Sequence, residues 1–278
     1  MQVVRAWSPP IGPLGRLSSL SRERAATARA ETTLETLTAR ALATPAPPSL
    51  LGALATGMAL GVAVIAEVKR RSPSKGAIND ALDPVAQVDA YARGGAVAFS
   101  ILTEPSEFGG SLDDLQRAAA SQRGPCIRKD FIVDEVQLAE ARLAGAAGAL
   151  LIARALPSER LHALVHGAQM LGLEPLVEVR DEHELDDALA AGARLVGVNN
   201  RDLETLAIDD AVSAHLLPRI PRDVVAVYES GVAAQADVAR AAAMGADAVL
   251  VGSWLSAATD PVAAVASLTG VARTPRVG

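Results

Sequence analysis

The sequence is poor in the residues that disulfides, aromatic cores and membrane spans require. Only 3% of its 278 residues are aromatic, and Cys126 is the single cysteine. One cysteine excludes an internal disulfide and favours a reducing compartment, so we expect a cytoplasmic protein. No apolar run approaches the length of a membrane span, and the first twenty residues lack the continuous apolar stretch of a signal peptide.

Positive charge is also scarce, and lysine is the scarcest form of it. The net charge of −6 offers no basic field for nucleic acid or an anionic membrane, so we expect neither as a partner. The chain has twenty-three arginines but only three lysines, which are Lys69 and Lys75 in AEVKRRSPSKG and Lys129 in IRKDF. A desolvated ammonium can lose its proton, whereas guanidinium cannot, so Lys69 and Lys129 are acid–base candidates. The alternative is chance survival in a biased composition.

What the chain has in abundance is short apolar runs separated by alanine-rich segments with helical spacing. Half of the residues are hydrophobic. Eight runs rich in Val, Ile and Leu recur, at residues 62–68, 96–102, 126–130, 148–153, 175–179, 194–199, 224–230 and 247–252. Continuous apolar strands that alternate with helices imply a buried parallel sheet. Eight such units predict an α/β fold, a (β/α)₈ TIM barrel; a doubly wound open sheet is the alternative.

The first sixty residues predict a helical extension of this barrel. Residues 1–17 are rich in Pro and Gly, and we expect them to fray. A helix is expected over residues 18–42, ended by ATPAPPS, and a second short helix over residues 49–55. We therefore divide the chain into an extension, 1–60, and a catalytic barrel, 61–278.

Polar side chains stand where five of the strands end. In a (β/α)₈ barrel the active site lies at these carboxyl ends. The residues are Glu67, Lys69, Lys129, Glu178, Asn199, Glu229 and Ser230. Period-two alternation puts Glu67 and Lys69 on the same inward face. Buried charges are costly unless they are paired, so we expect an arranged cluster at the barrel mouth. A purely structural ion-pair network is the alternative.

The last two strands are each followed by a Gly-Ser pair that predicts a phosphate site. Ser230-Gly231 follows the seventh strand, and Gly252-Ser253 follows the eighth. Glycine lets an anion approach the backbone, and the N–H groups of a helix N-terminus attract negative charge. Ser72, in the loop after the first strand, adds a hydroxyl.

The histidines and the cysteine give weaker signals. His162 and His166 share one face of an outer helix and are expected to be solvated, while His183 and His215 have no obvious partner. Cys126 is expected to pack as a small hydrophobe. Without a cluster of suitable ligands, we expect no metal and no other cofactor.

The charged motifs are similar to those of a known family. They are VIAEVKRRSPSKG, SILTEPSEFGGSLDDL, IRKDFIVDEVQ, LLIARAL, PLVEV, GVNNRDLETL, YESGV and VLVGSWL. In this order and spacing, from about residue 62 to 255, they resemble indole-3-glycerol phosphate synthase. The resemblance implies a carboxy-lyase of tryptophan biosynthesis. Its substrate, 1-(2-carboxyphenylamino)-1-deoxyribulose 5-phosphate, closes to indole-3-glycerol phosphate with loss of CO₂ and water.

The resemblance also implies catalytic roles. Lys129 would be the general acid that protonates the ribulose carbonyl as the aromatic carbon attacks it. Lys69 and Glu178 would manage the later dehydration, with Glu178 as the base. Four further residues would orient these groups and complete the mouth: Glu67, Asn199, Glu229 and Ser230.

Substrate binding is assigned in the same way. The phosphate would be held by Ser72, Gly231, Gly252 and Ser253. Arg201 or Lys69 would meet the substrate carboxylate, and Phe131 would stack beside the aromatic ring. The sugar phosphate is the partner that we expect, with the chain a monomer and a weak homo-oligomer as the alternative.

The proposed general acid needs a suitable pKa. General acids work best when their pKa lies near the working pH, and a lysine reaches that range when it is desolvated beside other cations. Alternation turns Arg128 away from the interior, so we expect Lys69 to be the charge nearest Lys129.

Two positions depart from the family pattern, and two other functions compete. Leu50 stands where an aromatic residue is usual, and Tyr228 where a small one is; alternation should send the Tyr228 ring outward. A phosphoribosylanthranilate-type isomerase would need a Cys or Asp pair at the strand ends. A non-catalytic paralogue that binds an anthranilate-sugar phosphate would have lost a catalytic charge.

Overall fold

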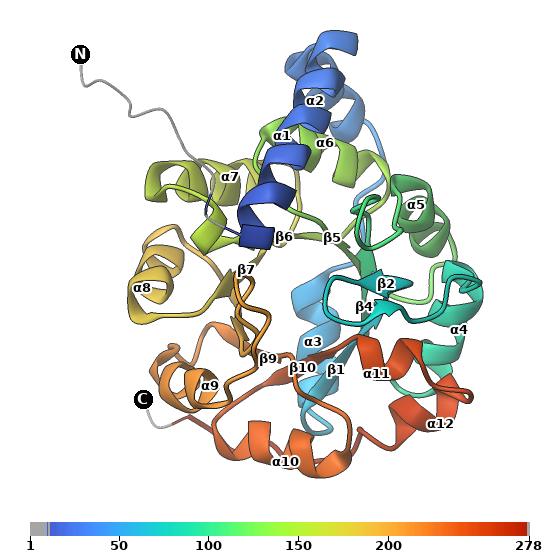
Figure 1. Cartoon of the computed structure of the whole chain (residues 1–278), viewed down its shortest axis with the longest axis vertical. Helices are drawn as coiled ribbons and strands as arrows, with labels where there is room; N and C mark the ends of the chain where they lie inside the picture. Colours follow the sequence, from blue (N-terminus) through green and yellow to red (C-terminus); the bar gives the residue numbers. More distant parts are fainter. Residues whose placement is uncertain (1–9, 11, 277–278) are drawn as a thin grey trace.

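A closed parallel barrel forms the centre of the computed structural model, which describes residues 10 and 12–276 (Figure 1). Neighbouring strands pair in chain order, and the last returns to the first. The strands are β1 (Ala63–Val68), β4 (Ala98–Leu102), β5 (Cys126–Lys129), β6 (Gly148–Ile152), β7 (Leu176–Val179), β8 (Leu195–Asn199), β9 (Val225–Glu229) and β10 (Ala248–Val251). Each lies within one of the eight apolar runs, so the predicted (β/α)₈ barrel is confirmed.

Helices surround the barrel and connect each strand to the next (Figure 1). They are α4 (Pro84–Arg93), α5 (Leu112–Ala120), α6 (Glu135–Leu143), α7 (Ser158–Met170), α8 (Glu182–Ala190), α9 (Ala211–Leu216), α10 (Gln235–Ala243), α11 (Ser253–Ser256) and α12 (Pro261–Ala266). Short 3₁₀ turns, η1 (Ala153–Ala155) and η2 (Leu217–Arg219), and a small hairpin of β2 (Arg71–Ser72) and β3 (Gly76–Ala77) complete the connections. Gly145 and Gly245, just beyond α6 and α10, have φ of +83° and +94°, which glycine adopts without strain.

Two hydrophobic cores follow from the alternation of side chains along the strands. The outer core lies between strands and helices and includes Tyr228, whose ring points outward as predicted. The Tyr228 hydroxyl donates to Asp210 Oδ1 at 3.0 Å. The inner core fills the barrel with side chains such as Ile65 and Ile127. Leu50, one of the two departures, is fully buried in this inner core.

Three helices precede the barrel: α1 (Gly12–Glu31), α2 (Leu34–Leu42) and α3 (Leu50–Met58). The single helix expected over 18–42 is wrong, because Thr33 interrupts it by accepting the Thr36 N–H as a new N-cap. The expectation that residues 1–17 fray is wrong for Gly12–Leu17, which are helical. Residues 1–9 and 11 lie outside the described part.

The extension covers both ends of the barrel. Helix α2 packs on α6, at the top of Figure 1, with Leu37 buried. Helix α3 packs on β1 and β4 and places Leu54 in the inner core beside Ala63, at the amino ends of the strands. Helix α1 lies toward the carboxyl ends and contributes Leu14 and Leu17 to the same core. The carboxyl end therefore acquires an apolar cover.

Candidate active site

A cavity of about 310 Å³ opens at the carboxyl ends of the strands. All thirteen residues that the sequence singles out line it: Glu67, Lys69, Ser72, Lys129, Phe131, Glu178, Asn199, Arg201, Glu229, Ser230, Gly231, Gly252 and Ser253. Its volume is at the small end of the range for small-molecule sites.

Lys129 lies at the centre of three buried carboxylates. Its Nζ is 3.1 Å from Glu229 Oε2, 3.5 Å from Glu178 Oε2 and 4.0 Å from Glu67 Oε2. Their side chains are at most 5% exposed, against 16% for Lys129. Four strands, β1, β5, β7 and β9, each contribute one of these groups.

The charges around Lys129 differ from the sequence expectation. Burial alone would lower the pKa of Lys129, but the negative charges of Glu229, Glu178 and Glu67 outweigh it and raise the pKa above its usual value. The expectations that Lys69 is the charge nearest Lys129, and that a neighbouring cation lowers the pKa of Lys129, are therefore wrong. The strand ends predicted these carboxylates at the same mouth, but not that they would lie nearest to Lys129.

Lys69 is paired with the carboxylate two residues before it. Lys69 Nζ lies 2.6 Å from Glu67 Oε1, so the predicted shared face of the two residues is confirmed. Burial raises the pKa of Glu67, but Lys69 and Lys129 outweigh this and hold the pKa below its usual value. Gly252 provides room for the pair, since a Cβ there would lie 2.1 Å from Glu67 Oε1.

Glu229 differs from Glu67 in the direction in which its pKa is shifted. Burial raises its pKa most, Lys129 opposes this and Glu178 adds to it, with a result of about 7. Its Oε1 is buried without a hydrogen-bond partner in the described chain and packs against Gly197, where a Cβ would lie 2.0 Å away. A carboxyl with this pKa can exchange a proton near neutral pH.

Asn199 links the polar residues on the β8 and β9 side of the mouth. Its Oδ1 accepts from Ser230 Oγ and from the Arg201 backbone N–H, both at 2.9 Å. The Arg201 guanidinium donates to Leu206 O at 2.8 Å, and burial lowers its pKa. Within the described residues no carboxylate pairs with Arg201. This cation remains available to an anionic ligand.

The predicted phosphate residues lie around the same opening. Ser230 and Gly231 have φ of +70° and +90°, so the chain after β9 turns through a left-handed conformation. Gly252 follows β10 as the N-cap residue of α11, and Ser253 begins that helix. Ser72 is buried, and its Oγ accepts the Lys75 N–H at 3.2 Å. Small side chains and turning backbone leave space for an anion here.

The apolar wall of the cavity contains residues that sequence reasoning missed. Phe108 and Phe131 face each other with ring centroids 6.2 Å apart and planes inclined by 43°. Leu14 and Leu17 of α1 line the cavity beside them. The i,i+3 spacing of these leucines is the available signal, and the surrounding Pro and Gly residues mask it.

The remaining candidates lie elsewhere. His215 has a partner after all, Glu182, at 2.6 Å on the surface. Cys126 begins β5, and burial raises the pKa of its thiol to about 12. In residues 10 and 12–276 no group of three or more His, Cys, Asp or Glu side chains is arranged to hold a metal ion. Nor does any helix there combine the length and hydropathy needed to cross a bilayer.

An acid–base cluster at the carboxyl ends of the strands defines an enzyme of the (β/α)₈-barrel class. The family model described as Indole-3-glycerol phosphate synthase matches residues 14–268. The chain therefore belongs to the indole-3-glycerol phosphate synthase family and is a carbon–carbon lyase of tryptophan biosynthesis.

Individual relatives agree with this assignment. The chain is 51% identical to an indole-3-glycerol phosphate synthase of Kineococcus radiotolerans over 78% of its own length and 79% of the relative's. It is 44% identical to one of Rhodococcus jostii, over 93% and 96%. Among solved structures, 3-hexulose-6-phosphate synthase from Salmonella typhimurium has a TM-score of 0.58 at 14% identity, over 74% of this chain and 96% of that one. That likeness shows the fold alone.

Proposed function

We propose that this cavity closes 1-(2-carboxyphenylamino)-1-deoxyribulose 5-phosphate to indole-3-glycerol phosphate. The aromatic carbon that bears the carboxylate attacks the ribulose carbonyl, and the new bond forms as that oxygen takes a proton. CO₂ then leaves, and the electrons of its broken bond restore the benzene ring. Loss of the new hydroxyl as water, with a proton from the neighbouring methylene carbon, forms the second double bond of the indole. The reaction needs one acid near the carbonyl and an acid–base pair for the dehydration.

The observation that carries this proposal is the position of Lys129 among three carboxylates. A raised pKa keeps Lys129 protonated in the free enzyme, so it meets the substrate as a proton donor. Glu229, with a pKa of about 7, is partly protonated near neutral pH. When it is neutral, one of the charges that hold the proton on Lys129 is absent, and transfer to the carbonyl becomes easier.

Dehydration is assigned to groups beside this acid. Glu178 removes the ring proton as a general base, and its position 3.5 Å from Lys129 allows the two to act on one substrate. Lys69, held by Glu67, is the second cation of the mouth and supplies the proton for the departing hydroxyl. Asn199 and Ser230, which are joined by a side-chain hydrogen bond, orient the substrate hydroxyls.

Three further parts of the cavity match the rest of the substrate. Arg201, which lacks a carboxylate partner in the described chain, and Lys69 attract the substrate carboxylate. The phosphate fits the loops that hold Ser72, Gly231, Gly252 and Ser253. Phe131 and Phe108 cover the aromatic ring.

The test is to incubate the purified chain with this substrate and to follow indole fluorescence. We expect fluorescent product and stoichiometric CO₂, with no metal or cofactor added. Binding of the substrate without product would indicate a non-catalytic paralogue. Turnover of phosphoribosylanthranilate in place of ring closure would indicate an isomerase. Either result would overturn the proposal.

The organisation of the chain and its location are proposed separately. We propose that residues 1–60 act as an extension of a catalytic barrel at 61–278, because α1 and α3 both contribute to the inner core. The single cysteine favours a cytoplasmic location, and we propose that the chain is a monomer there. Sedimentation of the full chain tests the oligomeric state.

A further inference from the structure

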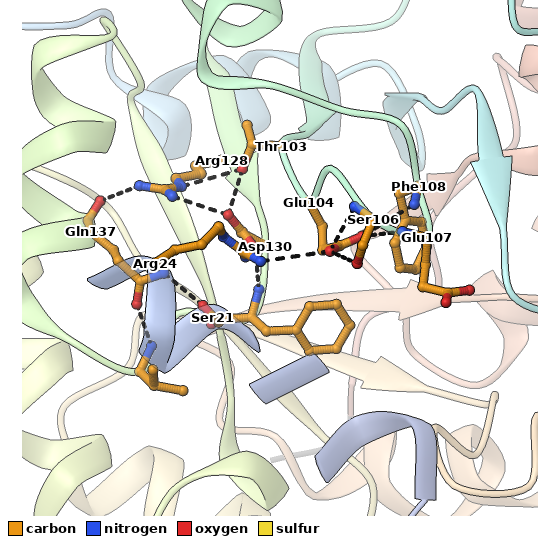
Figure 2. Close-up of polar contacts among 12 residues, drawn as sticks. Ser21, Arg24, Thr103, Glu104, Ser106, Glu107, Phe108, Arg128, Asp130 and Gln137 are labelled. Atoms are coloured by element: carbon orange, nitrogen blue, oxygen red, sulfur yellow. Dashed lines mark hydrogen bonds and ion pairs between the residues drawn. The ribbon is translucent and has the colours of Figure 1, made fainter. Parts of the chain in front are cut away.

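A polar network at the edge of the cavity, which Asp130 itself lines, joins α1 to the loops after β4 and β5 (Figure 2). At its centre is Arg24, whose Nη2 donates to Asp130 Oδ1 at 2.8 Å and whose Nη1 lies 3.6 Å from Glu104 Oε1. Both carboxylates are at most 1% exposed, while the Arg24 side chain is 31% exposed. By contrast, Arg16 and Arg29 of the same helix pair with carboxylates whose side chains are 21–32% exposed.

Asp130 occupies the position between Lys129 and Phe131, the acid and the ring-stacking residue. Its Oδ1 also accepts the Phe131 N–H at 2.9 Å, and its Oδ2 accepts from Thr103 Oγ1 at 2.8 Å and from Arg128 Nη2 at 3.0 Å. Burial raises the pKa of Asp130, but Arg128 and Arg24 outweigh this and hold the pKa below its usual value. An ionised Asp130 therefore fixes the backbone that follows Lys129.

The Glu104 carboxylate stabilises a turn in the loop after β4. Its two oxygens accept the backbone N–H groups of Ser106 at 3.0 Å, Glu107 at 2.8 Å and Phe108 at 3.2 Å. This turn carries Phe108 to the wall of the cavity, opposite Phe131. The two carboxylates that Arg24 bridges thus set the position of both phenylalanines.

Two hydrogen bonds of a second residue hold the same helix in place. Ser21, one turn before Arg24, donates to the Phe131 carbonyl oxygen and accepts from Gln137 Nε2 at 2.7 Å. These bonds hold α1 where Leu17 lines the cavity. Arg24 does not itself line the cavity, so any effect on the reaction passes through the residues that it holds.

We propose that Arg24 is a positioning residue: by bridging Asp130 and Glu104 it holds α1, Phe108 and Phe131 around the aromatic ring of the substrate. This rests on the function proposed above. The bridge joins three segments that are remote in sequence, and guanidinium is suited to it because its fork presents several donors at once. A misplacement of about 1 Å caused outside a reacting centre can cost on the order of 10²-fold in rate.

The test compares Arg24→Met with Arg29→Met in the full chain. Arg29 is on the same helix and pairs with Asp134 at 2.7 Å, but it is 39% exposed and touches neither Asp130 nor Glu104. We expect Arg24→Met to lower kcat/KM about 10- to 100-fold, mainly through KM. Arg29→Met should stay within about twofold. Arg24→Lys should recover part of the loss, because an ammonium can pair with one carboxylate but not bridge two.

Ligand binding separates positioning from general stability. We expect Arg24→Met to weaken binding of the product, indole-3-glycerol phosphate, while the Kd of inorganic phosphate stays unchanged, because phosphate uses the loops after β9 and β10. An equal loss for both ligands, or kcat/KM within about twofold of wild type, would overturn the proposal. If Arg24→Met does not fold, Arg24→Gln replaces it with the same two outcomes. An inactive wild type would count against the proposed function, and product binding would still decide the role of Arg24.

Discussion

Charged groups are buried at both ends of this barrel, but they are paired differently. At the amino end, Arg276 donates to Asp247 Oδ2 at 2.6 Å and to the carbonyl oxygens of Gly245 and Val224 at 2.8 and 2.7 Å. Asp247 also accepts the Ala226 N–H and pairs with Arg273. Each of these residues has a charged partner within the protein, and Arg273 Nε is the one buried side-chain atom of the cluster that lacks a hydrogen bond in the described chain.

The carboxyl end lacks this balance. Two lysines face three glutamates, Glu229 Oε1 has no hydrogen-bond partner in the described chain, and Arg201 has no carboxylate. A buried polar group without a partner costs free energy, and one that faces a cavity can regain a partner when a ligand binds. The comparison predicts that substitutions at the carboxyl end reduce turnover with little loss of stability, and that substitutions at the amino end do the reverse.

The largest effect is expected for Lys129→Arg, which keeps the charge at the centre of the mouth. Guanidinium stays protonated, so it pairs with the carboxylates but cannot act as the acid. We expect kcat to fall by about 10²–10⁴-fold. Phosphate binding and the thermal midpoint should change little. Steady-state indole fluorescence measures the rate, and turnover near wild type would refute the general-acid role.

Arg276→Met tests the opposite end. Removing one partner of a buried ion pair is expected to cost about 3–5 kcal/mol in the free energy of unfolding, because Asp247 and several carbonyl groups lose donors. Below the melting transition, kcat should match wild type. Urea unfolding gives the first quantity, and Arg219→Met, at an exposed pair with Glu182, is the control with a cost of about 1 kcal/mol or less. A large loss of kcat in folded Arg276→Met would contradict the prediction that the amino-end charges serve stability and not turnover.

A smaller, pH-dependent effect is expected at Glu229. The carboxyl titrates at about 7 in the folded chain and at its usual value, 4.5, when unfolded. Between these values the folded chain binds more protons, so the free energy of unfolding falls as pH rises. Glu229→Gln removes this dependence and should gain stability relative to wild type from about pH 4.5 to 7. Urea unfolding across that range checks the trend, and parallel curves would contradict the raised pKa.

The barrel was predictable from sequence because its signals are local. Strands buried on both faces appear as continuous apolar runs, and period-two alternation places Glu67 and Lys69 inward and Arg128 and Tyr228 outward. The ends of parallel strands meet at one face of the barrel. These rules bring the polar residues at the strand ends to one cavity without any knowledge of how the strands pair, while Arg201 and Phe131 were placed there by the family resemblance.

What could not be predicted depends on contacts between segments remote in sequence. Gly12–Leu17 look unstructured because Pro and Gly weaken a helix, yet burial of Leu14 and Leu17 against the barrel stabilises it. The pKa of Lys129 depends on three carboxylates that arrive from other strands. Arg24 has no local signal at all, since its partners lie about a hundred residues later.

The smallest effect is expected for Gly197→Ala, which tests whether the position of Glu229 beside Lys129 matters for turnover. A Cβ at this position would lie 2.0 Å from Glu229 Oε1 and 3.3 Å from Leu176 Cδ1, while the strand backbone needs no change. The flexible carboxyl end can move aside, so stability should be nearly retained. The displaced Glu229 would leave its place 3.1 Å from Lys129, and we expect kcat to fall about tenfold. Gly172→Ala is the control for adding a methyl group at a glycine, since nothing lies within 4 Å of its Cβ, although its φ of +73° adds backbone strain. Stability lost in Gly197→Ala without any loss of kcat would mean that Glu229 belongs, like Arg276, to the structural charges.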